Sequence, residues 1–251
     1  MSRTSANLKS PVHTFRSCEK YVPCDMYMYF AEYTPSLSVS VSKGDKQLTV
    51  DDTTGISAGD VITIYEDCWI FQNLVNSVID GTHLTLKVGV DYDFTTDCEI
   101  EVGSWNAGGL DGSGTTKKFY IKAPPSGNYV IRTLNVSMLD SSDMDDGMFG
   151  GLSELTNGIQ FAIDNGFSKN LALVVNNLGF WEIGFDCVYS SKAPSGQYGF
   201  KARRDILGVN GVDVILEAGT TAEFQVFIND DLDGLDLLDF VVNGHLVPVN
   251  C

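Results

Sequence analysis

The sequence has little basic charge: sixteen Lys and Arg residues stand against thirty-three Asp and Glu residues, and the formal net charge is -17. Such a charge repels nucleic-acid phosphates, so we expect no DNA or RNA partner. Long apolar segments are also missing, since the longest uninterrupted run is LALVV, residues 171–175. Residues 1–10 contain no apolar core of a signal peptide. The sequence therefore predicts no membrane span, no secretory signal and a chain made in a cytoplasm.

Residues that commonly carry catalysis are scarce. The three histidines, His13, His83 and His245, lie in no recognisable nucleophile motif. The glycine-rich stretch GGLDGSGTT lacks the Gly-Lys-Ser/Thr sequence of a phosphate-binding loop. Pairs of carboxylates carry no information in a chain with so many acids. We therefore predict a protein that is not an enzyme and that has no cofactor.

Six cysteines are present, but their spacing does not favour a metal site. There is no CxxC motif, the closest pair is Cys18 and Cys24, and the histidines do not supply ligand spacing. The prediction for structural zinc, and for a metal in general, is therefore negative.

The cysteines have other predicted roles. Cys18 and Cys24 on an N-terminal arm, with Cys251 on the last residue, are candidates for disulfides between subunits. The alternative is unpaired surface thiols. Cys68 and Cys98 lie in one small region and are candidates for an intradomain disulfide. Cys187 shares a predicted strand face with aromatic and aliphatic residues, which predicts a buried thiol.

The stretch NDDLDGLDLLDF, residues 229–240, partly matches a calcium-binding EF-hand loop. Its first half supplies oxygen ligands and a glycine, but position 12 is Phe240, where the loop needs Glu. Residues 141–154 miss the pattern as well, and both stretches follow strand-like rather than helical segments. We predict an acidic turn, with weak cation candidates at Asn229, Asp231 and Asp233.

Alternating apolar and polar residues predict an all-β protein with four parts. Residues 1–35 form an extended N-terminal arm, which is basic in its first twenty residues and aromatic near its end. A small β domain follows at 36–105, a Gly-rich linker at 106–116, and a larger β-sandwich or jelly-roll-like domain at 117–251. Segment 69–78 suits a helical turn or a strand, and Asn243-Gly244 predicts a tight hairpin between the last two strands.

Three C-terminal stretches carry a resemblance to a known group of proteins. They are IRTLNVSMLDSSDMDDGMFGGLSELTNGIQFAI, KAPSGQYGFKARRDI and EAGTTAEFQVFINDDLDGLDLLDFVVNGHLV. They resemble β-sandwich structural proteins around the head, neck and collar of tailed bacteriophages. KGDKQLTVDDTTGISAGDVITI is similar to small β modules of phage fibre and decoration proteins. The resemblance carries no catalytic residues over to this chain.

The resemblance implies a non-enzymatic virion component on the outer surface of the capsid. A capsid decoration or minor capsid protein is expected first, and a collar, neck or tail-fibre component is the alternative. The expected partners are other copies of the chain, as a homotrimer, and the major capsid or neck proteins of the same virion. A host-glycan-binding module is a third hypothesis, with Trp105, Trp181 and the Asp-rich turns lining the site.

Overall fold

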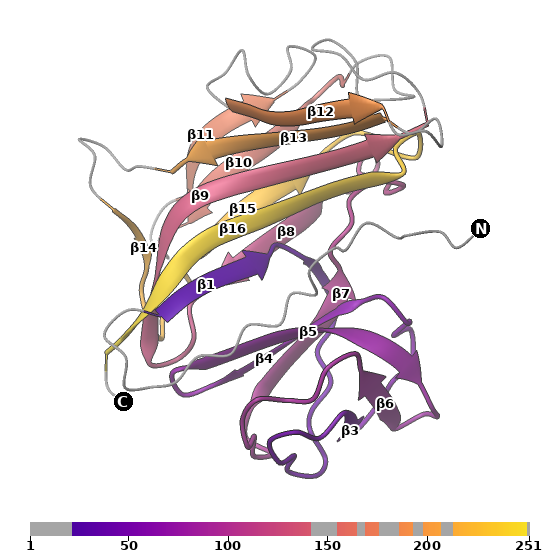
Figure 1. Cartoon of the computed structure of the whole chain (residues 1–251), viewed down its shortest axis with the longest axis vertical. Coiled ribbons are helices and arrows are strands. Elements are labelled where there is room, and N and C mark those ends of the chain that lie inside the picture. The colour runs from indigo at the N-terminus through magenta and orange to yellow at the C-terminus, as the bar shows by residue number, and fades with distance from the viewer. Residues whose placement is uncertain are drawn as a thin grey trace.

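The computed structural model describes residues 22–141, 155–164, 169–175, 186–192, 198–206 and 213–249. These residues form an all-β structure, which confirms the predicted fold class. Figure 1 shows an upper lobe of two stacked sheets and a lower lobe of shorter strands. None of the described segments is a helix long and apolar enough to cross a membrane.

The upper lobe is a sandwich of two antiparallel sheets. The first sheet has the strand order β1-β16-β9-β13-β12, with β14 also pairing with β9. Its strands are β1 (Val22–Tyr27), β16 (Leu237–Pro248), β9 (Gly127–Asp140), β13 (Tyr198–Asp205), β12 (Asp186–Lys192) and β14 (Val214–Leu216). The second sheet has the order β11-β10-β15-β8, built from β11 (Lys169–Val175), β10 (Ile159–Asp164), β15 (Glu223–Ile228) and β8 (Lys117–Lys122).

The lower lobe is a smaller antiparallel unit with the strand order β2-β7-β4-β5-β6-β3. Its strands are β2 (Phe30–Tyr33), β7 (Glu99–Ser104), β4 (Val61–Glu66), β5 (Trp69–Val78), β6 (His83–Leu86) and β3 (Gln47–Thr49). Segment 69–78 is thus a strand and not a helical turn. Its alternation places Phe71 and Val75 in a buried cluster with Ile64 and Leu84.

The sandwich core follows from the period of two along its strands. On β16, Leu238, Phe240 and Val242 are fully buried, while Val241 between them faces outward and is partly exposed. The Phe240 ring packs edge-on against two rings of the opposite sheet, Phe119 at 6.1 Å and Phe161 at 5.8 Å between centroids. Each such buried ring contributes about 1.5–3 kcal/mol, so the aromatic cluster holds the two sheets together.

The predicted hairpin at Asn243-Gly244 is wrong, because β16 runs straight through these residues. The strand pairs with β9 from Leu237 to Pro248, with a register shift between Asn243 and Gly244. A Cβ at Gly244 would lie 2.3 Å from the Val130 carbonyl oxygen. The glycine therefore permits a close backbone approach at a bulge, and the long partner strand outweighs the local turn preference.

Part of the predicted arm belongs to the folded body. Strands β1 and β2 both fall within residues 1–35, and they pair with β16 and β7 respectively. Residues 1–21 lie outside the described part of the chain. The arm prediction therefore needs correction for 22–33, whose apolar side chains are used in both lobes.

The Gly-rich segment 106–116 is held against the sandwich along its length. The Ala107 amide donates to the Leu238 carbonyl at 2.7 Å, and the Gly112 amide donates to the Asp230 carbonyl at 2.9 Å. These backbone hydrogen bonds fix the segment in place, so it does not act as a flexible tether.

Candidate functional site: the joint between the lobes and a surface pocket

Residues 22–33 form one of the connections between the two lobes, beside the segment from β7 to β8. Residues 22–33 contribute β1 to the sandwich and then β2 to the smaller unit. Between these strands, the Met28 amide donates to the Phe240 carbonyl at 2.9 Å, and Tyr29 exchanges backbone hydrogen bonds with Tyr120 of β8. Within twelve residues the chain therefore contributes a strand to each lobe. This leaves little freedom for one lobe to move against the other.

A buried polar network fills the joint. The Tyr29 hydroxyl lies 2.8 Å from the Tyr65 hydroxyl and donates to the Glu101 carboxylate. The same carboxylate accepts from the Tyr120 hydroxyl at 2.8 Å and from Lys122 Nζ at 2.9 Å. Tyr65 and Glu101 come from the smaller unit, while Tyr120 and Lys122 come from the sandwich. The network thus joins the lobes with partners for both Glu101 oxygens.

The surroundings fix the protonation states in this joint. Burial raises the pKa values of Tyr29, Tyr65 and Tyr120 well above the ordinary tyrosine value, and the Glu101 charge raises them further. Burial acts to lower the pKa of Lys122, but its hydrogen bonds and charge interactions with Glu99 and Glu101 outweigh that effect and raise it. The phenols are therefore neutral donors, and the lysine is a cation at neutral pH.

Two further side chains close the joint around Tyr27. Gln72 of β5 accepts from the Tyr27 amide at 2.9 Å and donates to the Tyr27 carbonyl at 3.1 Å. The Trp105 ring packs edge-on against the Tyr27 ring, with centroids 5.3 Å apart, and its Nε1 donates to the Gly59 carbonyl. Trp105, predicted as part of a glycan site, thus lies at the joint.

The acidic stretch 229–240 is organised by its own hydrogen bonds. The Asp230 carboxylate accepts from the backbone amides of Thr156, Asn157 and Gly158 at 2.8–3.2 Å. Leu232 and Leu235 anchor the stretch in the core. The buried Asp230 carboxylate therefore holds the backbone of residues 156–158 in place.

The weak cation candidates are already hydrogen bonded. Asn229 Oδ1 accepts from the Thr116 hydroxyl at 2.9 Å, and Asp231 Oδ1 accepts from the Asp233 amide at 3.0 Å. Within the described ranges, no group of three or more His, Cys, Asp or Glu side chains is arranged to hold a metal ion. A weakly held cation at Asn229, Asp231 and Asp233 stays a prediction.

Cys24 does not suit a disulfide between subunits. It is a free thiol in β1 with no exposed surface. Burial, together with the nearby Asp25 charge, raises its pKa well above the usual thiol value. A second chain cannot reach this sulfur while β1 stays paired with β16, so the prediction for Cys24 is wrong.

The predicted bridge between Cys68 and Cys98 is absent, because Cys98 carries a free thiol. Burial and the Glu66 charge raise the Cys98 pKa to about 12, so the thiol is unreactive at neutral pH. Cys68 lies instead beside the sandwich, with its Sγ 3.3 Å from the Ser126 carbonyl oxygen.

Other predicted residues fall outside the described part of the chain. These are Cys18, Trp181 and Cys251. Cys187 has a described backbone in β12, where it pairs with Ala202, but its side chain is not described.

The outer face of the first sheet contains a pocket of about 220 Å³ that the sequence analysis missed. It is lined by Tyr27, Asn135, Val136, Ser137, Lys201, Ala202, Asp239 and Val241. Asp239 is 2% exposed, and its Oδ1 has no hydrogen-bond partner. A signal was present in the sequence, since Asp239 interrupts the apolar run LLDFVV.

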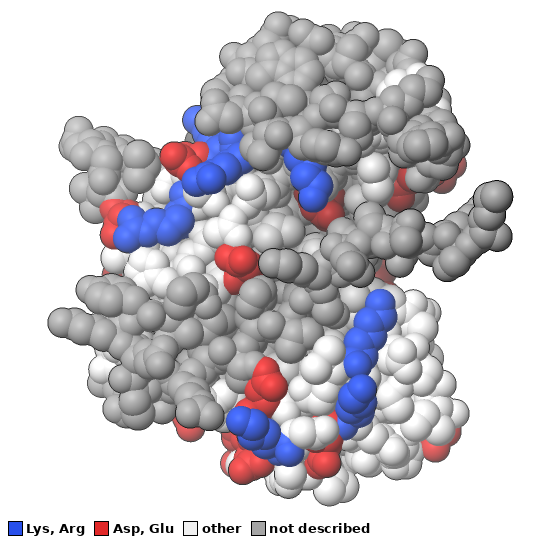
Figure 2. Space-filling view, in the orientation of Figure 1, with Lys and Arg blue, Asp and Glu red and all other residues white. Residues whose placement is uncertain are grey.

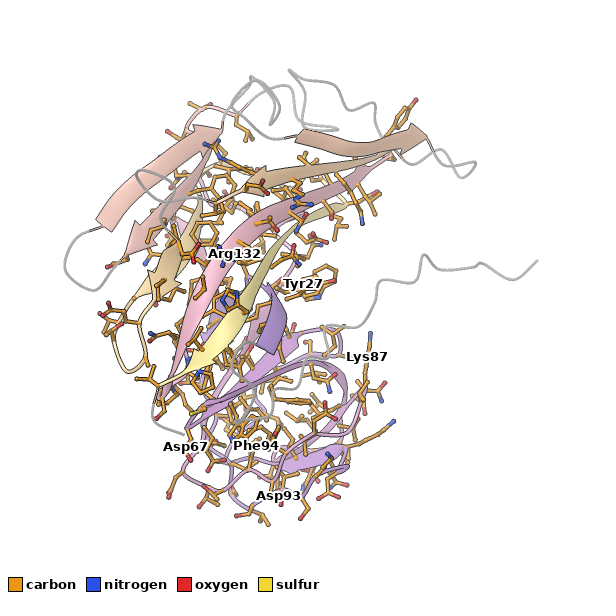
Figure 3. The ribbon with its side chains drawn as sticks, turned by 60° about the vertical axis from the view of Figure 1, so that its left-hand side comes forward. Tyr27, Asp67, Lys87, Asp93, Phe94 and Arg132 are labelled. Atoms are coloured by element: carbon orange, nitrogen blue, oxygen red, sulfur yellow. The ribbon has the colours of Figure 1, made fainter. Side chains whose placement is uncertain are left out.

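A second, more open pocket of about 620 Å³ lies farther along the same sheet. Arg132 on β9 is labelled in Figure 3, and its guanidinium forms an ion pair with Asp213 in this pocket. His245 also lines it, and burial and the Arg132 charge lower the His245 pKa, partly opposed by Asp213. Because Arg132 is already paired with Asp213, the pocket offers no unpaired cation for an anionic ligand.

Comparisons with protein-family models, curated proteins and solved structures found no match to this chain.

Proposed function

We propose that this protein is a non-enzymatic structural component of a bacteriophage virion. Its proposed place is the outer surface of the capsid, as a decoration or minor capsid protein, after synthesis in the host cytoplasm. The resemblance of residues 37–250 to phage head, neck and collar proteins supports this assignment. The geometry supports a structural role through one observation, the buried joint at Glu101.

The joint favours a part that must keep its shape within an assembly. If the lobes separated, the Glu101 carboxylate would lose the Tyr120 and Lys122 groups that come from the other lobe. Breaking a buried charge pair in this way costs about 3–5 kcal/mol. A protein of independently moving domains would not need such a connection. The two lobes are therefore suited to project from a shell as one unit.

The proposed contacts with other virion proteins involve the charged surface and the two ends of the chain. On the face seen in Figure 2, described basic side chains lie beside acidic ones and form no continuous basic surface. We therefore propose protein partners, namely other copies in a homotrimer and the major capsid or neck proteins. The basic segment 1–20 is the proposed docking arm. Cys18 and Cys251 remain the candidates for disulfides between subunits, Cys251 only where it is not paired within its own chain.

Quantitative mass spectrometry of purified particles tests this proposal. We expect the chain at hundreds of copies per particle, as for a decoration protein on an icosahedral shell. About a dozen copies would place it at the neck or collar instead. Absence from particles that contain every other structural protein would refute the virion assignment. Immunogold labelling of intact particles then checks that it lies on the outer surface.

A further inference from the structure

The 220 Å³ pocket is built across four neighbouring strands of the first sheet. Asp239 of β16 lies directly opposite Ser137 of β9, which lies opposite Lys201 of β13. Tyr27 of β1 pairs with Val241 and closes the other side. Lys201 is exposed and Tyr27 is partly exposed, so the pocket opens to solvent with Asp239 at its floor. Figure 3 shows the Tyr27 side chain projecting outward from the edge of the sheet.

The floor of the pocket has an unmet hydrogen-bonding need. The Ser137 hydroxyl and backbone amide act to lower the pKa of the Asp239 carboxyl, against the larger effect of burial. Asp239 Oδ1 is nevertheless buried and without a hydrogen-bond partner. An unpaired buried acceptor costs free energy, which a donor supplied by a ligand would recover. Asp239 lines the pocket, but Oδ1 itself has no exposed surface. A ligand donor therefore reaches this oxygen once the carboxyl group rotates about χ2, a torsion that is broad for Asp.

The charges and surfaces of the pocket limit the class of ligand. The Lys201 ammonium and the Asp239 carboxylate interact favourably and balance each other, so the pocket carries no net charge. A neutral ligand with several hydroxyl groups would bind without separating them. Burial and the Asp239 charge raise the Tyr27 pKa to about 12, so this side chain offers a neutral phenol and an aromatic wall.

The volume of the pocket limits the size of the ligand. A volume of about 220 Å³ equals about seven water molecules at liquid density. That space suits one sugar ring and is too small to enclose an oligosaccharide. The combination of a buried acceptor, flanking polar groups and an aromatic wall is the usual lining of a specific small-ligand pocket.

We propose that this pocket binds a single sugar unit, with a ligand hydroxyl donating to Asp239 Oδ1 and the carbon face of the ring packing against Tyr27. The sugar is either free or the end of a glycan chain. This inference does not rest on the virion assignment, because it concerns the isolated chain. Failure in the binding experiment below would leave the particle measurements unaffected.

Saturation-transfer NMR on the full-length protein tests the inference. The probes are glucose, galactose, mannose, N-acetylglucosamine and N-acetylgalactosamine, each as a free monosaccharide at millimolar concentration. We expect at least one to bind at pH 7. Asp239→Asn should weaken that binding about tenfold or more, because the amide in place of the carboxylate is a weaker acceptor for the sugar hydroxyl.

Three controls make the result specific to this pocket. Asp213→Asn alters a carboxylate in the other pocket of the same sheet and should leave binding unchanged. Lys201→Ala changes the exposed rim and should weaken binding without unfolding the protein. Burial raises the Asp239 pKa to about 6, against the opposing effects of Ser137 and Lys201, so binding should also weaken at pH 5.

Other outcomes would overturn the inference. Binding of none of the five sugars would leave a pocket filled by water alone. Equal binding by the Asp239→Asn variant would place the sugar elsewhere. Binding of glycine, used as a zwitterionic probe, in the absence of sugar binding would reassign the pocket to amino acids.

Discussion

Two carboxylates, Glu101 in the joint and Asp239 in the surface pocket, are almost equally buried, at 5% and 2% exposure. Both oxygens of Glu101 accept hydrogen bonds, from Tyr29, Tyr120 and Lys122. One oxygen of Asp239 accepts none. A satisfied buried charge connects parts of a fold, whereas an unsatisfied one costs stability and suggests a binding role. The same residue chemistry thus has opposite expected effects at the two places.

The largest effect is expected from Glu101→Ala in the joint. The change leaves the half-buried Lys122 without its buried partner and removes an acceptor for two tyrosine hydroxyls. We expect the free energy of unfolding in urea to fall by about 3–5 kcal/mol. Glu99→Ala is the matched control, since the Glu99 side chain is 54% exposed and should cost at most about 1 kcal/mol. Equal losses in the two variants would show that the joint network is not what connects the lobes.

The second largest loss of stability is expected from Gly103→Ala, where the backbones of β2 and β7 lie close together. A Cβ at Gly103 would lie 1.9 Å from the Phe30 carbonyl oxygen, so Gly103→Ala must push β2 away from β7. We expect a loss of about 3 kcal/mol in urea unfolding, at the upper end for overpacking because backbone cannot move aside easily. At Gly114 a Cβ would meet nothing within 4 Å, so Gly114→Ala should change stability by less than about 0.5 kcal/mol. A Gly103→Ala protein as stable as this control would contradict the close pairing of β2.

Asp239→Asn should increase the stability of the protein, whereas the two preceding substitutions decrease it. Burial raises the folded-state pKa of Asp239 from 3.8 to about 6, so its favourable contribution is present below pH 4 and lost as pH rises through 6. The ionised carboxylate therefore destabilises the protein at pH 8, by about 1–3 kcal/mol. We expect the variant to be more stable than the wild type at pH 8 and close to it at pH 4, measured by urea unfolding at both values. A less stable variant at pH 8 would mean that Asp239 is a structural residue like Glu101.

The last prediction concerns a disulfide near the C-terminus, for which we expect the smallest effect on stability. It compares the buried thiol of Cys24 with cysteines that can form a disulfide. The Val249 amide and Cys68 Sγ both lie near the Ser126 carbonyl oxygen, at 3.0 and 3.3 Å. Cys251 follows two residues later, a span of at most about 7 Å, so it can reach Cys68 within one chain. We expect non-reducing peptide mapping of oxidised protein to recover a Cys68–Cys251 link.

A gel of intact particles with and without reductant separates this link from bridges between subunits. Ladders that collapse on reduction would assign bridges between chains, and Cys18 would then be the first candidate. Monomer in both lanes, together with the mapped Cys68–Cys251 peptide, would remove inter-subunit disulfides from the proposed function. Cys24 should stay unlabelled by thiol reagents in the native protein, since it has no exposed surface.

Local patterns were enough to predict several features of this protein. The alternation of apolar and polar residues at 134–138, 159–163 and 224–228 is typical of strands, and these segments lie in β9, β10 and β15. The period of two works here because each strand buries one face against the other sheet. Phe240 stands at position 12 of the acidic stretch, where an EF-hand loop needs Glu. The sequence therefore predicted an acidic turn and not a calcium-binding loop. In the structure, Asp230 of that stretch binds backbone amides.

Features that depend on a distant partner were not predictable in this way. Asn243-Gly244 has the local chemistry of a hairpin, but pairing with the fourteen-residue β9 keeps the strand straight. Glu101 and Asp239 look alike in the sequence, each as an acid between two apolar residues.

The sequence by itself determined the all-β class and the buried face of many strands, because both follow from nearest neighbours along the chain. Only the tertiary structure decided that Glu101 meets Tyr29 and Lys122, while Asp239 is left with a free oxygen beside a pocket. The reason is that hydrogen-bond satisfaction depends on groups brought together from segments more than twenty residues apart. The period of a strand specifies which way a side chain points and not what it meets there.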